Sequence, residues 1–231
     1  MKNCRKELER AELHRTIWNM ANDLRGSVDG WDFKQYVLGM LFYRYISENI
    51  TAYINSMAHK SGKTEFDYSK ISDKEAEQIR KEIVKAKGFF ISPSDLFENV
   101  SARAKDDEHL NKTLQRIFRN IEASATGRVN ENNFKGLFDD LDVNSNKLGN
   151  TVAQRNEKLV RLLNSVAEMK LGDYKDNTID AFGDAYEYLI GMYASNAGKS
   201  GGEYYTPQEV SELLAHLTII GTNKVSQVYD P

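Results

Sequence analysis

The sequence predicts a mainly α-helical chain that ends with the first elements of an α/β domain. Apolar residues recur at helical spacing along almost its whole length. Only 3 prolines and 15 glycines occur among its 231 residues, which argues against a turn-dense all-β fold. Near the C-terminus, residues 225–229 have instead the pattern of a short buried strand.

The first two predicted helices cover residues 5–24 and 31–57, with a break at Gly26. Apolar residues of the first helix lie mostly on one face. The second helix is apolar on more than one side, so we expect it to be central and buried. The polar residues 59–70 are predicted to form a loop.

A capping box marks the start of the next helix, because Ser72 is followed three residues later by Glu75. We expect this helix to continue to about Lys87, and Gly88 suits its end. Residues 89–91 are compatible with a short strand. A short helix then follows at about 95–104.

Further helices are predicted along the second half of the chain. Their expected ranges are 110–121, a small helix near 133–138, 152–169, 179–194 and 206–220. The strand at 225–229 then leads into Asp230 and Pro231. Because a newly begun strand needs partners for its backbone groups, we expect an N-terminal fragment of a longer protein.

The composition of the chain argues against several classes of function. A net charge of −3 gives no overall basic field for nucleic acid. The single Cys4 excludes an internal disulfide framework and a multi-cysteine zinc site. Apolar runs are too short to span a bilayer, and no signal peptide is evident. We therefore predict a cytoplasmic protein with no membrane partner.

Two motif look-alikes fail on spacing. Gly198-Lys199-Ser200 resembles the end of a phosphate-binding P-loop, but Tyr193 stands where that loop needs glycine. Residues 140–144 resemble the start of a calcium loop, but Ser145 and Thr151 replace its glycine and glutamate. Histidines are scattered singly, so we predict no metal site.

The most informative segment is residues 201–209, where a Gly-rich loop leads to a helix start. Thr206 suits the N-cap, Pro207 the first helical position, and Glu209 completes a capping box. A helix N-terminus offers free backbone N–H groups to a carboxylate or phosphate, and two adjacent tyrosines could line such a site. Composition and spacing alone indicate only a well-capped helix after a loop.

Five blocks in order carry a family resemblance, at residues 17–29, 36–47, 144–149, 183–190 and 202–207. The last, Gly-Glu-Tyr-Tyr-Thr-Pro, is the most specific. On these blocks the chain resembles the modification (methyltransferase, M) subunit of type I DNA restriction-modification systems, over roughly residues 14–231. Residues 60–87 look like a local addition.

The resemblance implies a helical N-terminal domain at residues 1–172. It also implies that residues 173–231 are the first elements of a Rossmann-like α/β methyltransferase domain, truncated before the Gly-rich cofactor loop. Asp230-Pro231 matches the start of the family's Asp-Pro-x-x-Gly-x-Gly loop.

The resemblance also implies an activity: transfer of a methyl group from S-adenosylmethionine to adenine N6 in duplex DNA, on a base taken out of the stack. The family's catalytic Asn-Pro-Pro-aromatic motif does not occur in these residues, because the prolines are Pro93, Pro207 and Pro231. No catalytic residue is therefore assigned, and we expect the fragment to be inactive.

By the same resemblance, one segment forms part of the cofactor site. Thr206 and the following helix N-terminus would hold the methionine carboxylate of the cofactor, with Tyr204 or Tyr205 lining the site. Only part of the pocket is present, so we expect weak affinity. The implied cofactor-binding residues are Glu203, Tyr204, Tyr205, Thr206, Pro207 and Gln208.

The resemblance implies a specificity subunit as partner and, through it, a second M subunit and the restriction subunit, with duplex DNA in the full complex. The alternative is a non-catalytic helical interaction scaffold, which leaves the ordered loop, capping box and strand unexplained. A free-standing DNA-binding module is disfavoured because the arginines are dispersed. A single-chain enzyme that fuses cutting and methylation is disfavoured by the early helical blocks.

Overall fold

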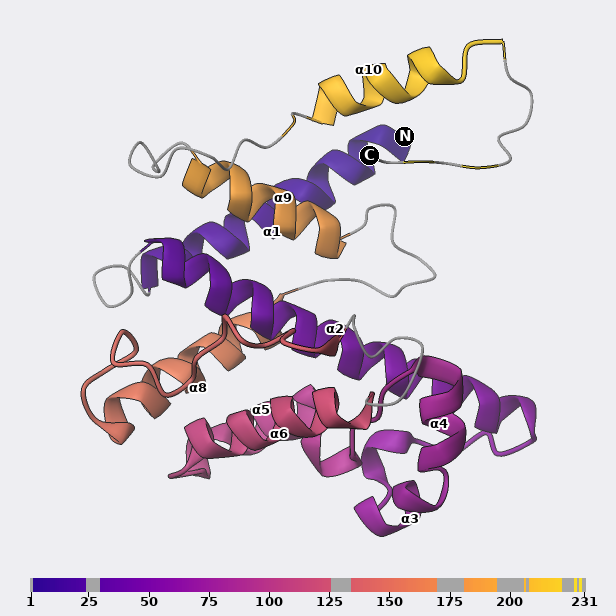
Figure 1. The fold of residues 1–231 in the computed structure, drawn as a ribbon, viewed down its shortest axis with the longest axis vertical. Coiled ribbons are helices and arrows are strands. Elements are labelled where there is room, and N and C mark those ends of the chain that lie inside the picture. The colour runs from indigo at the N-terminus through magenta and orange to yellow at the C-terminus, as the bar shows by residue number, and fades with distance from the viewer. Residues whose placement is uncertain are drawn as a thin grey trace. The chain divides into compact units, whose positions relative to one another are not determined.

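The structure is a computed structural model that describes residues 2–23, 30–125, 134–169, 181–194, 206, 208–221, 227 and 229. The chain divides into two compact units, Met1–Leu189 and Ile190–Pro231. Helices are the only regular elements among the described residues (Figure 1). None of these helices has the length and apolarity needed to cross a bilayer.

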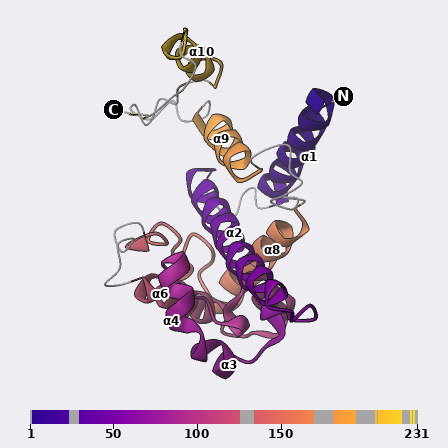
Figure 2. The ribbon, with the colours of Figure 1, turned by 90° about the vertical axis from the view of Figure 1, so that its right-hand side faces the viewer.

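The long helix α2 (Gly30–Lys60) runs through the first unit, as its many-sided apolar pattern predicts (Figures 1 and 2). It packs against α5 (Phe97–Arg103) and α8 (Val152–Glu168), and α8 also packs against α6 (Leu110–Ser124). The apolar face of each of these helices is buried, and burial of such area is the main stabilising contribution. The first helix, α1, covers Lys2–Asp23.

Aromatic rings fill the centre of the core. The fully buried Tyr43 of α2 meets Phe97 and Phe118 edge to face, with ring centroids 5.5 and 5.4 Å apart. This geometry brings the positive edge of one ring onto the negative face of another. It ties α2 to α5 and α6 at one point.

Polar contacts join α2 to α8. Arg44 of α2 donates from Nη1 to the carbonyl oxygens of Val166, at 2.6 Å, and Met169, at 2.8 Å. Its Nε donates to Glu48 Oε1 at 2.6 Å. The guanidinium thus adds a charged donor at the C-terminal end of α8, where the Val166 carbonyl also accepts the Met169 N–H at 3.3 Å.

The segment after α2 confirms two sequence predictions and alters a third. Ser72 forms the predicted capping box with Glu75, and Gly88 ends the helical region at a φ of +84°. The predicted single helix is instead two, α3 (Asp73–Gln78) and α4 (Arg80–Lys87). They are separated at Ile79, whose ψ of 5° interrupts the helical backbone.

The predicted strand at residues 89–91 is wrong. These residues are buried but form no strand, and the Phe90 N–H donates to Ser124 Oγ of α6 at 2.8 Å. A side-chain hydroxyl therefore takes the place of a neighbouring strand. The chain then forms short 3-10 helices at Pro93–Asp95 and Ala104–Asp106, on either side of α5; another lies earlier, at Tyr68–Lys70.

The connection from α6 to α8 is described from residue 134 onward. Phe134 is helical and residues 135–140 form turns, so the small helix predicted near 133–138 is seen only at Phe134 among the described residues. Tyr36 of α2 donates its hydroxyl to the Asp142 carbonyl at 2.8 Å. Leu141 lies so close to α2 that a Cβ at Gly39 would be 2.7 Å from its Cδ2.

The two remaining helices are α9 (Ala181–Ala194) and α10 (Gln208–Thr218), close to their predicted ranges. In α9, Ala185 and Leu189 are buried, and Tyr186 is 46% exposed. Most of the predicted strand at 225–229 lies outside the described residues. Gln227 and Tyr229 are described without regular structure, and Tyr229 is exposed rather than buried.

Candidate functional site

The predicted cofactor segment falls largely outside the part of the chain that the structure describes. This applies to Glu203, Tyr204, Tyr205 and Pro207. Thr206 is described and is exposed, and Gln208 is the first residue of α10. The assignment of these six residues to a cofactor site therefore stays a prediction.

Helix α10 begins two residues after Thr206. Its first turn has backbone N–H groups without partners in the helix, and the helix dipole adds a partial positive charge there. An anion is the ligand that such an end favours. The same helix has an exposed apolar stripe at i, i+3, i+4, i+7 spacing, formed by Val210, Leu213, Leu214 and Leu217.

A buried charge joins α9 to α1. Asp184 of α9 is 8% exposed, and its Oδ1 lies 2.8 Å from Nε of Arg10. The other oxygen, Oδ2, is buried and has no hydrogen-bond partner among the described residues. Removing the one cation beside a buried carboxylate is strongly destabilising.

One helical turn further on, the His14 ring stacks on Tyr188. The ring centroids are 4.1 Å apart and the planes differ by 11°. Burial in this stack lowers the pKa of His14, while Asp184 raises it and Arg10 lowers it by smaller amounts. The neutral imidazole is therefore the form that fits the contact.

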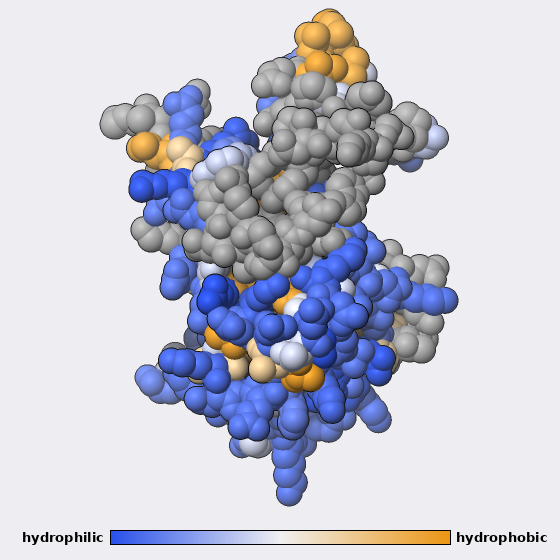
Figure 3. All heavy atoms as spheres, turned by 90° about the vertical axis from the view of Figure 1, so that its left-hand side faces the viewer, coloured by the Kyte–Doolittle hydropathy of each residue, from blue (hydrophilic) through white to orange (hydrophobic). Residues whose placement is uncertain are grey.

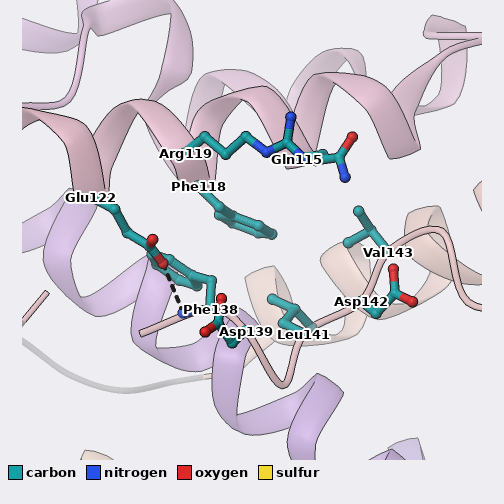
Figure 4. A pocket seen from close by; sticks show the side chains of 9 residues that line it. All are labelled: Gln115, Phe118, Arg119, Glu122, Phe138, Asp139, Leu141, Asp142 and Val143. Atoms are coloured by element: carbon teal, nitrogen blue, oxygen red, sulfur yellow. Dashed lines mark hydrogen bonds between the residues drawn. The ribbon is translucent and has the colours of Figure 1, made fainter. Parts of the chain in front are cut away.

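A groove opens between α6 and the turn at residues 138–143 (Figure 4). Its volume is about 190 Å³. The stacked rings of Phe118 and Phe138, 4.4 Å apart, form part of its wall, and the Phe138 N–H donates to Glu122 at 3.1 Å. The other lining residues are Gln115, Arg119, Asp139, Leu141, Asp142 and Val143.

An ion pair lies beside the aromatic core. Arg116 of α6 binds both carboxylate oxygens of Asp95 at 2.8 Å, and Asp95 is 8% exposed on its side chain. Tyr43 donates its hydroxyl to the Asp95 carbonyl oxygen. Burial, with Asp95 nearby, raises the pKa of Tyr43 well above its usual value. This arrangement holds a neutral phenol in the core and has a structural role.

The segment that resembles the start of a calcium loop forms a polar turn. Asp142 Oδ1 accepts the Asn144 N–H at 2.9 Å, which is an Asx turn. Among the described residues, no three His, Cys, Asp or Glu side chains are grouped so as to hold a metal ion.

Comparison with known protein families gives two matches in order along the chain. A model of the HsdM N-terminal domain matches residues 13–166, more than half of the chain. The chain belongs to the HsdM N-terminal domain family. A model of the N-6 DNA Methylase family matches residues 177–231, after a short gap.

Relatives of this HsdM-family chain have consistent names. It is 48% identical over 230 residues to the type I restriction enzyme MpnII methylase subunit of Mycoplasma pneumoniae, covering 96% of the chain but 42% of that protein. It is 23% identical to the MjaIX methylase subunit of Methanocaldococcus jannaschii, covering 95% of the chain and 37% of that protein. The chain thus spans about 40% of the length of these relatives.

A solved structure also matches the HsdM-family chain. The type I restriction-modification system methyltransferase subunit of Streptococcus thermophilus superposes with a TM-score of 0.72 at 30% identity. The match covers 92% of this chain and 44% of the other. The chain is therefore similar, in sequence and in fold, to the N-terminal part of such subunits.

Sequence reasoning did not identify the contacts that hold the HsdM fold together. Arg44 and Asp184 both lie inside blocks that carried the family resemblance, yet their partners are more than 100 residues away. The one available signal was Arg10 and His14, spaced one helical turn apart on α1. Their partners, Asp184 and Tyr188, have the same spacing on α9.

Proposed function

We propose that the chain is the N-terminal part of the methyltransferase subunit of a type I restriction-modification system. The observation that carries this proposal is the order of the two family matches, residues 13–166 and 177–231. The similarity to named methylase subunits over nearly the whole chain supports it. The complete protein would transfer a methyl group from S-adenosylmethionine to adenine N6 in duplex DNA.

In this proposal residues 1–172 form the helical domain, and residues 173–231 begin the methyltransferase domain. The gap between the two family matches supports a boundary near residue 172. The catalytic motif is absent from residues 1–231, so these residues alone would be inactive. Cofactor chemistry and DNA methylation belong to the complete protein.

The cofactor-binding residues are proposed to be Glu203 to Gln208. S-adenosylmethionine, when bound, supplies a methyl group on a positively charged sulfur. Thr206 and the first turn of α10 would bind the methionine carboxylate, because exposed N–H groups and a positive helix end fit an anion. Tyr204 or Tyr205 would line the site.

The proposed partners follow from the same family. The relatives are subunits of type I restriction enzymes by name. A specificity subunit would choose the DNA site and join this subunit to a second copy and to the restriction subunit. The mild acidity of the chain fits phosphate contacts made mainly by other parts of such a complex. The compartment would be the cytoplasm.

A methyl-transfer assay tests the proposal. The complete coding sequence is expressed with its specificity subunit, and the complex is incubated with S-adenosylmethionine and DNA from a host without N6-adenine methylation. We expect N6-methyladenine by mass spectrometry only when both subunits and the cofactor are present. An assembled complex that transfers no methyl group would overturn the proposal and favour the helical scaffold.

Two threonines of the α10 region give a matched pair for the cofactor site. Thr206→Ala removes a proposed ligand and should raise the Kd for S-adenosylmethionine by about tenfold, or about 1.4 kcal/mol. Thr218→Ala removes a hydroxyl that only donates to the Ala215 carbonyl at the other end of α10. Equal Kd values for both variants in calorimetry would exclude Thr206 from the site.

A further inference from the structure

Two residue pairs join α1 and α9 in the same register. Arg10 forms an ion pair with Asp184, and His14 stacks on Tyr188. The second pair therefore lies one turn after the first on both helices. The two helices therefore run in the same direction along the contact. Both pairs lie within the first compact unit, Met1–Leu189.

Apolar side chains on both helices are buried as well. Leu13 and Ile17 of α1 and Ala185 and Leu189 of α9 are at most 4% exposed. The ion pair and the ring stack thus lie beside buried apolar side chains, although the Arg10 side chain is 39% exposed and His14 and Tyr188 are half-buried. Arg10 is the cation beside the buried Asp184 carboxylate, and removing one partner of such a pair is destabilising.

Helices α1 and α9 lie in the regions of two different family matches. α9 lies within residues 177–231, which match the N-6 DNA Methylase model, whereas the second half of α1, with His14 but not Arg10, lies in the HsdM match. The compact unit that contains α1 ends at Leu189, inside α9. One continuous helix therefore begins on the helical unit and extends beyond it.

We infer that Arg10 and His14 form a clasp that holds α9, the first helix of the methyltransferase domain, on the helical domain. The clasp lies within the first compact unit and holds residues 184–189 of α9 to α1, although these helices are far apart in sequence. The names of the two domains rest on the proposed function; the contact itself does not. Opening the clasp frees α9 while the core around α2 stays folded.

Hydrogen exchange of the chain, followed by mass spectrometry, tests the clasp. Arg10→Gln leaves the buried Asp184 without its cation, so amides in peptides covering 185–194 should exchange at least about tenfold faster. Peptides from α6 and α8 should be unchanged. Unchanged exchange at 185–194, or an equal increase in all helices, would overturn the inference.

A double variant and a control sharpen the result. Arg10→Gln with Asp184→Asn removes both charges, so the exchange rate of α9 should return to within about threefold of wild type. Additive effects of the two substitutions would overturn the direct pairing. As the control, Arg161→Gln breaks an exposed ion pair with Glu157 on α8 and should leave α9 unchanged.

Tyr188→Ala provides a second route to the same readout, because it removes the ring stack and keeps both charges. It should also accelerate exchange at 185–194, and protection equal to wild type would remove His14 from the clasp. The readout does not depend on methyl transfer. If α9 is protected but the protein has no methyltransferase activity, only the proposed function is overturned. If the protein has methyltransferase activity but α9 is not protected, only the clasp is overturned.

Discussion

Replacing Arg44 with methionine tests how strongly one guanidinium stabilises the packing of α8 on α2. The Arg44 side chain is 14% exposed, and Nη1 lies within 2.8 Å of the Val166 and Met169 carbonyl oxygens. Methionine keeps much of the apolar stem but has no donor. The Met169 carbonyl then loses this charged donor, and the Val166 carbonyl keeps the Met169 N–H at 3.3 Å; both residues are buried.

The expected loss is about 3 kcal/mol. A hydrogen bond from a charged donor contributes about 1.5–3 kcal/mol net, and the two bonds share one nitrogen, so they do not add fully. At about 2–4 °C per kcal/mol for a unit of this size, the melting temperature should fall by about 6–12 °C. The change is measured by urea unfolding and by thermal melting, both followed by circular dichroism.

Two controls separate the capping from general effects. Arg44→Lys keeps a charge but cannot bond both carbonyls and Glu48 together, so it should cost about half as much. Arg161→Met breaks an exposed pair with Glu157 and should cost about 0.5 kcal/mol or less. If Arg44→Met changes the free energy of unfolding no more than Arg161→Met, the reasoning about α8 is refuted.

Three further predictions concern other contacts. Asp95→Asn should lower the free energy of unfolding by about 2 kcal/mol in urea melts, because it breaks a bidentate ion pair in which Asp95 is buried and Arg116 is half-exposed; a loss below about 1 kcal/mol would contradict this. The pKa of His14 is lowered by burial, so the unfolded chain takes up that proton first, and stability should fall as the pH drops below about 6.5. His14→Phe should reduce this fall, which urea midpoints at pH 7 and pH 5.5 would reveal, and an unchanged pH dependence would exclude His14 as its source. Leu213→Lys with Leu217→Lys interrupts the exposed stripe of α10 and should reduce self-association of the chain in sedimentation velocity, whereas equal sedimentation of both proteins would show that the stripe is not involved.

Helices and their ends were predictable where a local rule determines them. Ser72 with Glu75 is a two-residue signal for a helix start, and Gly88 is a one-residue signal for an end. The break at Ile79 has no such signal, because Ile fits the interior of a helix as well as its end. Residues 89–91 were predicted as a strand because they are apolar, yet apolarity reports burial and not backbone pairing.

The candidate site was predictable only as a segment. The Thr206-Pro207 pair and the helix after it follow from sequence, and α10 begins near the expected place. The pairing of Arg10 with Asp184 does not follow, because it joins residues 174 positions apart and depends on how helices pack. The groove beside Phe118 was equally unpredictable, since half of its wall comes from turns between α6 and α8.

The close approach of Leu141 to Gly39 links the shape of the groove to the backbone of α2. Leu141 rests against the bare backbone of α2 and at the same time lines the groove on its other side. A single methyl group at position 39 would lie 2.7 Å from Leu141 Cδ2, so Leu141 would have to shift and the groove that it lines would change shape. The shape of this surface is thus set by a residue that has no side chain.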